Sequence, residues 1–228
     1  MIAATRRHNR PLFVLVGGAT GVGKSTVAEG LARRLGIVRV VSTDVIREVL
    51  RAALDLDNRP SLAVSTFEAG ELKGIREREE ATAQVGADGF AAASDAVVAG
   101  FQQQVKVVAS GIQALMRRAL VEATDMIVEG VHLVPGVIDL PHEREAITVP
   151  IVVGVEDVDA HQSYHVARSH GTPSRPPERY LNRFDEIRRI QAEVVRRAQE
   201  HGVPTVYAKT PDTTIDAALA IINKALTD

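Results

Sequence analysis

The chain has 228 residues, of which 45% are apolar, a formal net charge of −2 and no cysteine. This length and apolar content suit a single domain with one substantial core, and the missing cysteines exclude disulfides, thiolate zinc sites and cysteine nucleophiles. The near-neutral charge and the aromatic content of only 4% argue against a protein that binds nucleic acid or a membrane surface.

A glycine-rich segment follows the first predicted strand, residues 12–16, and precedes a predicted helix over residues 24–35. Glycines let consecutive backbone N–H groups point at phosphate, and a helix N-terminus adds positive charge. This order predicts a P-loop that binds a nucleotide through Gly18, Ala19, Thr20, Gly21, Val22, Gly23, Lys24, Ser25 and Thr26. Lys24 is expected to reach the β- and γ-phosphates, and the Ser25 hydroxyl is expected to be a ligand of Mg²⁺.

The second predicted strand, residues 37–41, leads to Asp44 and then to an amphipathic helix. Asp44 is our candidate for orienting an acceptor hydroxyl and taking its proton, or for contacting Mg²⁺ through a water molecule. The alternative is that Asp44 is simply the N-cap of this helix. Arg47 lies on the same side of the first helical turn, where an arginine suits an anionic acceptor.

Residues 58–123 contain no good strand and form a predicted helical insertion, placed where P-loop kinases often carry their acceptor-binding region. The predicted helices cover residues 62–73, 75–85 and 90–123. Gly100 and Gly111 are unfavourable positions within the last of these helices.

The third predicted strand, residues 126–128, ends at Glu129. Ligands of doubly wound sheets bind beyond the carboxyl ends of the strands, so Glu129 is expected to hold a Mg²⁺-bound water or the acceptor, or else to be a buried structural carboxylate. His132 either donates to a phosphate or carboxylate or is an ordinary loop histidine. Strands at 147–153 and 203–207 and a helix at 214–226 complete an α/β fold with a five-stranded parallel sheet and helices on both faces.

A lid is predicted at about residues 160–185, because a proline-rich basic loop, residues 170–177, separates two helical patterns there. Lids close over the substrate and exclude water. Some arginines of this region are expected to turn inward and neutralise phosphate charge, with Arg175 in a catalytic role and Arg168, Arg179 and Arg183 in substrate binding. One helix is predicted over residues 177–200.

Four segments together resemble the 2-phosphoglycerate kinase family: GGATGVGKST at 17–26, STDVIREV at 42–49, VEGVHLVPG at 128–136 and ERYLNRFDEIR at 178–188. The resemblance covers about residues 14–206. It implies a single P-loop kinase domain over residues 1–228, with ATP and Mg²⁺, that phosphorylates the free hydroxyl of 2-phosphoglycerate to give 2,3-diphosphoglycerate and ADP. The negative charges of this small phosphorylated hydroxy acid would explain Arg47 and the lid arginines.

Two other functions stay open from the residues alone. One is a nucleotide, nucleoside or sugar kinase of the same architecture, and the other is an NTP-dependent switch or RNA-binding protein. The first strand is too short to span a membrane and no signal-peptide pattern precedes it, so a cytoplasmic enzyme without nucleic-acid or membrane partners is expected. The sequence is compatible with a homodimer but does not determine the oligomeric state.

Overall fold

The computed structural model describes residues 10–72, 74, 95–169 and 177–227. Its centre is one parallel sheet of five strands in the order β2-β3-β1-β4-β5. The strands are β1 (Leu12–Gly17), β2 (Val40–Ser42), β3 (Met126–Gly130), β4 (Ile147–Gly154) and β5 (Thr205–Tyr207). The predicted five-stranded parallel α/β fold is therefore confirmed.

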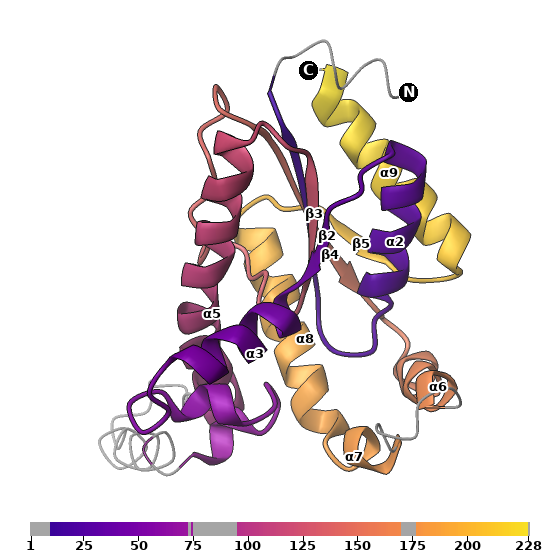
Figure 1. Cartoon of the computed structure of the whole chain (residues 1–228). Coiled ribbons are helices and arrows are strands. Elements are labelled where there is room, and N and C mark those ends of the chain that lie inside the picture. The colour runs from indigo at the N-terminus through magenta and orange to yellow at the C-terminus, as the bar shows by residue number, and fades with distance from the viewer. Residues whose placement is uncertain (1–9, 73, 75–94, 170–176, 228) are drawn as a thin grey trace, which may run out of the picture.

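Helices cover the sheet on both faces, which explains why β1 is apolar along its whole length. Leu12, Val14 and Val16 pack with α2 (Lys24–Leu35) and α9 (Pro211–Thr227). Phe13 and Leu15 point the opposite way and pack with α5 (Ala96–Val121). Figure 1 shows α2 and α9 on one side of the sheet and α5 on the other, with α8 (Phe184–Glu200) packed against α5 and β4.

The segment after β2 differs from the prediction in one respect that concerns the site. Helix α3 (Thr43–Ala53) begins directly after the strand, and its N-cap is Ser42, whose hydroxyl accepts a hydrogen bond from the Asp44 N–H at 3.2 Å. The alternative that Asp44 is the N-cap is therefore wrong. Asp44 lies in the first turn, where a carboxylate interacts favourably with the helix dipole.

The predicted helix over residues 62–73 is wrong. This segment forms two short 3₁₀ turns, η1 (Pro60–Ala63) and η2 (Ala69–Glu71), separated by a turn in which Glu68 accepts from the Ser65 N–H at 3.1 Å. The reason is tertiary, because the backbone of Ala69 and Gly70 packs directly on Gly100 of α5. The predicted helix over 75–85 lies outside the described residues.

Helix α5 begins at Ala96, with Asp95 as its N-cap, and runs without a break through Gly100 and Gly111. The predicted helix is therefore confirmed from Ala96 onward, and the two glycines, which are unfavourable for a continuous helix, do not interrupt it. The predicted start at residue 90 lies outside the described residues.

The segment predicted to form a lid contains one helix break more than predicted. Instead of one helix over 177–200, the chain forms α7 (Pro177–Leu181) and α8, separated at Arg183, whose backbone is not helical. Helices α3, α6 (Val158–Ser169) and α7 all lie beyond the end of the sheet at which the P-loop turns (Figure 1). None of the helices in the described ranges is long and apolar enough to cross a membrane.

We predict that Gly100→Ala destabilises the protein more than Gly111→Ala. A Cβ at position 100 would lie 2.3 Å from the carbonyl carbon of Ala69 and 2.4 Å from the amide nitrogen of Gly70, so backbone would have to move. Overpacking of this kind costs about 1–3 kcal/mol. Urea denaturation of both variants measures the difference.

Gly111→Ala is the matched control in the same helix. Its Cβ would meet only side-chain atoms, Ile46 Cγ2 at 2.6 Å and Leu50 Cδ1 at 3.2 Å, and alanine recovers about 1 kcal/mol of helix propensity. Equal losses in the two variants would contradict the close backbone packing at Gly100.

Candidate active site

The P-loop backbone has the geometry of a phosphate cradle. Gly18, Gly21 and Gly23 have φ values of +142°, +84° and +88°, which residues with a Cβ rarely adopt. Gly23 leads directly into α2, whose N-terminal N–H groups are available to an anion. The Lys24 side chain is buried, and its ammonium donates to the Ala19 carbonyl at 2.6 Å, so its positive charge lies within the turn.

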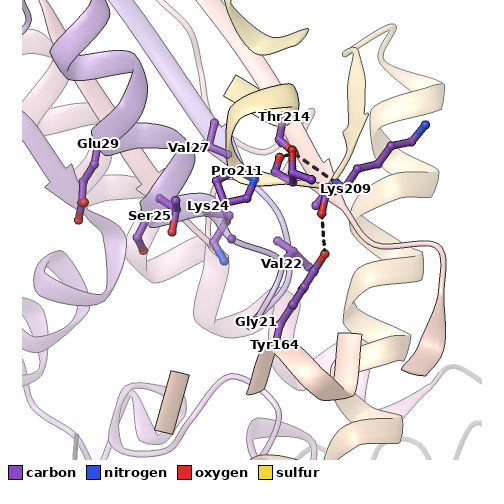
Figure 2. A pocket seen from close by; sticks show the side chains of 14 residues that line it. Gly21, Val22, Lys24, Ser25, Val27, Glu29, Tyr164, Lys209, Pro211 and Thr214 are labelled. Atoms are coloured by element: carbon purple, nitrogen blue, oxygen red, sulfur yellow. Dashed lines mark hydrogen bonds between the residues drawn. The ribbon is translucent and has the colours of Figure 1, made fainter. Parts of the chain in front are cut away.

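A cavity of about 510 Å³ adjoins this cradle, a volume typical of cofactor pockets. The P-loop and the first turn of α2 line one side, and Tyr164 of α6 and residues 208–211 line the other. The Tyr164 hydroxyl donates to the Lys209 carbonyl at 3.1 Å, and Figure 2 shows the Lys209 side chain directed away from the cavity. The backbone of the loop before α9, and not its lysine side chain, therefore faces the cavity.

His161 connects helix α6 to the P-loop, and sequence reasoning did not identify it. The side chain is buried, and Nε2 lies 2.9 Å from the Thr20 carbonyl oxygen. A carbonyl only accepts, so Nε2 carries the hydrogen and donates. Burial lowers the pKa of His161, which favours this neutral donor. No local pattern could identify the contact, because 141 residues separate the partners.

The register of the sheet brings the carboxylate candidates to the P-loop edge. Glu129 pairs with Val16 of β1 on one side and with Ser42 of β2 on the other. Its side chain is buried at the carboxyl end of β3. Asp44 follows Ser42 by two residues and is exposed. Both acids thus lie at the strand ends where the sequence predicted them.

Two of the predicted substrate-binding arginines reach the same turn from different helices. Arg47 of α3 donates to the Val64 carbonyl at 2.7 Å, and Arg179 of α7 donates to the Ser65 hydroxyl at 2.8 Å. Arg179 also pairs with Glu68 at 3.1 Å. The Arg47 side chain is only 17% exposed, and its Nε, within the described part of the chain, is buried without a hydrogen-bond partner.

Arg183, the other predicted lid arginine whose side chain the structure describes, bonds different partners. Arg183 pairs with Glu71 at 2.6 Å and with Glu186 at 3.2 Å. Arg168 lies on α6, but its side chain is outside the described part of the structure, as is all of Arg175.

His132 follows β3 and is completely buried. Its Nδ1 is 2.9 Å from the Thr43 hydroxyl and its Nε2 is 3.0 Å from the Gln104 side-chain oxygen, so both ring nitrogens are bound within the protein. Burial lowers the pKa of His132 to about 4, with Asp44 opposing the shift and Arg47 and Lys24 adding to it. The ring is therefore neutral near pH 7, and its charged neighbours include residues of both the P-loop and α3.

Comparison with known proteins identifies relatives over nearly the whole chain. A family model described as an AAA domain matches residues 13–129. A solved shikimate kinase from Acinetobacter baumannii in complex with shikimate covers 98% of this chain and 97% of its own, with a TM-score of 0.48 and 16% identity.

Two curated archaeal relatives are much closer in sequence. The 2-phosphoglycerate kinase of Methanopyrus kandleri is 38% identical over 226 residues, which cover 97% of this chain and 63% of that protein. The 2-phosphoglycerate kinase of Thermococcus kodakarensis is 38% identical over 221 residues, which cover 97% of this chain and 69% of that protein. The chain thus spans about two thirds of the length of these relatives.

We predict an acid-side loss of stability that depends on His132. Its folded-state pKa of about 4 lies below the ordinary value of 6.5, so between these values the unfolded chain binds more protons. Stability is therefore complete above pH 6.5 and falls as the pH drops toward 4, by up to about 1.4 kcal/mol per pH unit. Urea denaturation at several pH values measures this slope.

His132→Gln removes the ionisable ring and should flatten the slope, leaving the smaller contribution of His161. An unchanged slope in His132→Gln would contradict the buried, neutral ring.

Proposed function

The chain belongs to the 2-phosphoglycerate kinase family, and on that premise we propose that it transfers the γ-phosphoryl group of MgATP to the free hydroxyl of 2-phosphoglycerate. The products are 2,3-diphosphoglycerate and ADP. The observation that carries this proposal is the convergence of Arg47 and Arg179 on the turn at Val64 and Ser65, where an anionic acceptor would replace Glu48 and Glu68 as their ion-pair partners. Phosphoryl transfer needs such positioning and charge more than covalent help from the protein.

On the donor side, the cavity next to the P-loop supports ATP as the phosphoryl donor. We assign the triphosphate to the glycine turn with the Lys24 ammonium beside it, and the base to the space between Tyr164 and residues 208–211. Ser25 lines the same cavity, and its hydroxyl fits a Mg²⁺ held otherwise by water and phosphate oxygens. Bound Mg²⁺ would neutralise charge on the phosphates. In the described ranges, no cluster of three acidic or histidine side chains offers another metal site.

On the acceptor side, the guanidinium forks of Arg47 and Arg179 suit a ligand that carries both phosphate and carboxylate. We assign Asp44 to orienting the acceptor hydroxyl and taking its proton, or to a water-mediated Mg²⁺ contact. Glu129, buried at the next strand end, is assigned to holding a Mg²⁺-bound water or the acceptor.

The remaining assignments extend this proposal. Arg168 and Arg175 would neutralise phosphate charge when the lid closes, and Arg183 would do so after leaving Glu71 and Glu186. His132 would act from beneath the site without direct substrate contact. We further propose a cytoplasmic enzyme, monomeric or homodimeric, whose partner is this small acid and not nucleic acid or a membrane.

The test is ADP release with MgATP against 2-phosphoglycerate, 3-phosphoglycerate, glycerate and nucleoside monophosphates, with product identity checked by mass spectrometry. We expect strong selectivity for 2-phosphoglycerate. Lys24→Ala should abolish this activity with the fold intact, because the β- and γ-phosphates lose their ammonium partner. Turnover that responds to nucleoside monophosphates but to no glycerate would replace this acceptor with a nucleotide, and unaltered turnover in Lys24→Ala would contradict the P-loop assignment.

We predict that Asp44→Asn lowers kcat by roughly 100-fold, because an amide cannot take the acceptor proton. Steady-state kinetics with 2-phosphoglycerate measures this, and circular dichroism checks the fold.

Ser42→Ala is the matched control for Asp44→Asn. It removes the N-cap of the same helical turn and leaves the carboxylate, so it should cost about 1 kcal/mol of stability while lowering kcat far less than Asp44→Asn does. If Asp44→Asn instead lost stability and kept its turnover, Asp44 would be structural.

A further inference from the structure

Three buried polar side chains connect the elements that carry the residues proposed to act on the phosphoryl acceptor. They are Thr43 at the start of α3, His132 after β3 and Gln104 in the middle of α5, and none is exposed to solvent. His132 lies 2.9 Å from the Thr43 hydroxyl and 3.0 Å from the Gln104 oxygen. Buried polar groups are unfavourable unless they are hydrogen-bonded, and here they bond one another.

The donor and the acceptor of each hydrogen bond in this network can be assigned by starting from the Gln104 amide. The Gln104 amide nitrogen donates to the carbonyl of Ser61 and, at 3.0 Å, to the carbonyl of Val64, so the side-chain oxygen faces His132. This oxygen only accepts, which places a hydrogen on Nε2 of His132. In a neutral ring Nδ1 is then an acceptor, and the Thr43 hydroxyl donates to it. The network fits one tautomer and one amide orientation.

Each end of the network lies next to a residue that we assign to the phosphoryl acceptor. At one end, Thr43 immediately precedes Asp44 in the first turn of α3. At the other end, the Val64 carbonyl that accepts from Gln104 also accepts from Arg47 at 2.7 Å. The position of the proposed base and that of the proposed anion-binding arginine thus depend on the same buried side chains.

Gly130 permits this arrangement at the end of β3. Its φ is +150°, and a Cβ there would lie 1.8 Å from the Thr43 hydroxyl oxygen. Only a glycine lets α3 approach the strand closely enough for Thr43 to reach His132.

We propose that Thr43, His132 and Gln104 are positioning residues for phosphoryl transfer, which hold Asp44 and Arg47 in register with the acceptor. The inference rests on the proposed function. None of the three touches substrate; each acts through the residue that it fixes. Misplacement of a reacting group by about 1 Å lowers the rate by up to about 100-fold. Residues that fix the positions of Asp44 and Arg47 therefore affect turnover without contacting the substrate.

Two variants of His132 each keep one of its two hydrogen bonds and remove the other. His132→Asn keeps an acceptor near the position of Nδ1 and so keeps the bond to Thr43, whereas His132→Gln keeps a donor near Nε2 and so keeps the bond to Gln104. We expect His132→Gln to lower kcat about tenfold, because Asp44 loses its support. We expect His132→Asn to raise KM for the acceptor about tenfold, because the turn that holds Arg47 loses its support. KM for ATP should stay unchanged in both.

The wild-type protein separates the two possible failures. If the wild type does not respond to 2-phosphoglycerate, the proposed function fails, and the variants are measured with the acceptor that the panel identifies. If the wild type is active and both variants lose only thermal stability, or change KM for ATP and for the acceptor alike, the positioning role is overturned.

A second pair of variants applies if the His132 variants do not fold. Thr43→Ser keeps the hydroxyl and should keep kcat, whereas Thr43→Val has a similar volume without it and should lower kcat about tenfold. Equal kcat values would overturn the proposal. Nitrogen-15 NMR of the histidine rings tests the network without any acceptor: a hydrogen on Nε2 of His132 is expected, and a hydrogen on Nδ1 would contradict it.

Discussion

The parallel pairing of β1 with its two neighbours is the constraint on which the site depends. β1 is buried along its length between β3 and β4, and its last residue, Gly17, pairs with Gly130 and with Val152. Parallel strands end at one edge of a sheet, so the P-loop, the start of α3 and the loop after β3 have to meet there. The nucleotide cradle and the acidic candidates lie together because of this register and not because of their spacing in the sequence.

Polar contacts join the helices that lie beyond this edge of the sheet to the P-loop and to neighbouring turns. His161 holds α6 to the P-loop at Thr20, Tyr164 bonds the loop at Lys209, and Arg179 bonds the turn at Ser65. The Arg179 side chain is 51% exposed, and an exposed ion pair of this kind contributes about 1 kcal/mol or less. Such a contact is easily exchanged for one with another anion, whereas the buried His161 contact keeps α6 in place.

Local signals made parts of the fold predictable. The P-loop helix has the predicted bounds because its glycine turn and the C-cap Gly36 are both local. The segment after Pro60 was mispredicted because docking of its backbone on Gly100 overrides helix propensity. Asp44 was correctly predicted at the carboxyl end of the strands. The alternative that Asp44 is the N-cap was wrong, because Ser42 is both the last residue of β2 and the N-cap of α3. Gln104 could not be recognised, since it bonds His132 from 28 residues away.

The buried polar network is difficult to explain by stability alone. Apolar side chains of similar volume would fill the space between α3, β3 and α5, and they are often as stabilising as a satisfied polar group. Hydrogen bonds differ from apolar contacts in fixing orientation, and this network fixes a hydroxyl, a ring tautomer and an amide in succession. A site that carries out phosphoryl transfer requires such directional control, because its rate depends on the placement of groups that the protein does not bond covalently.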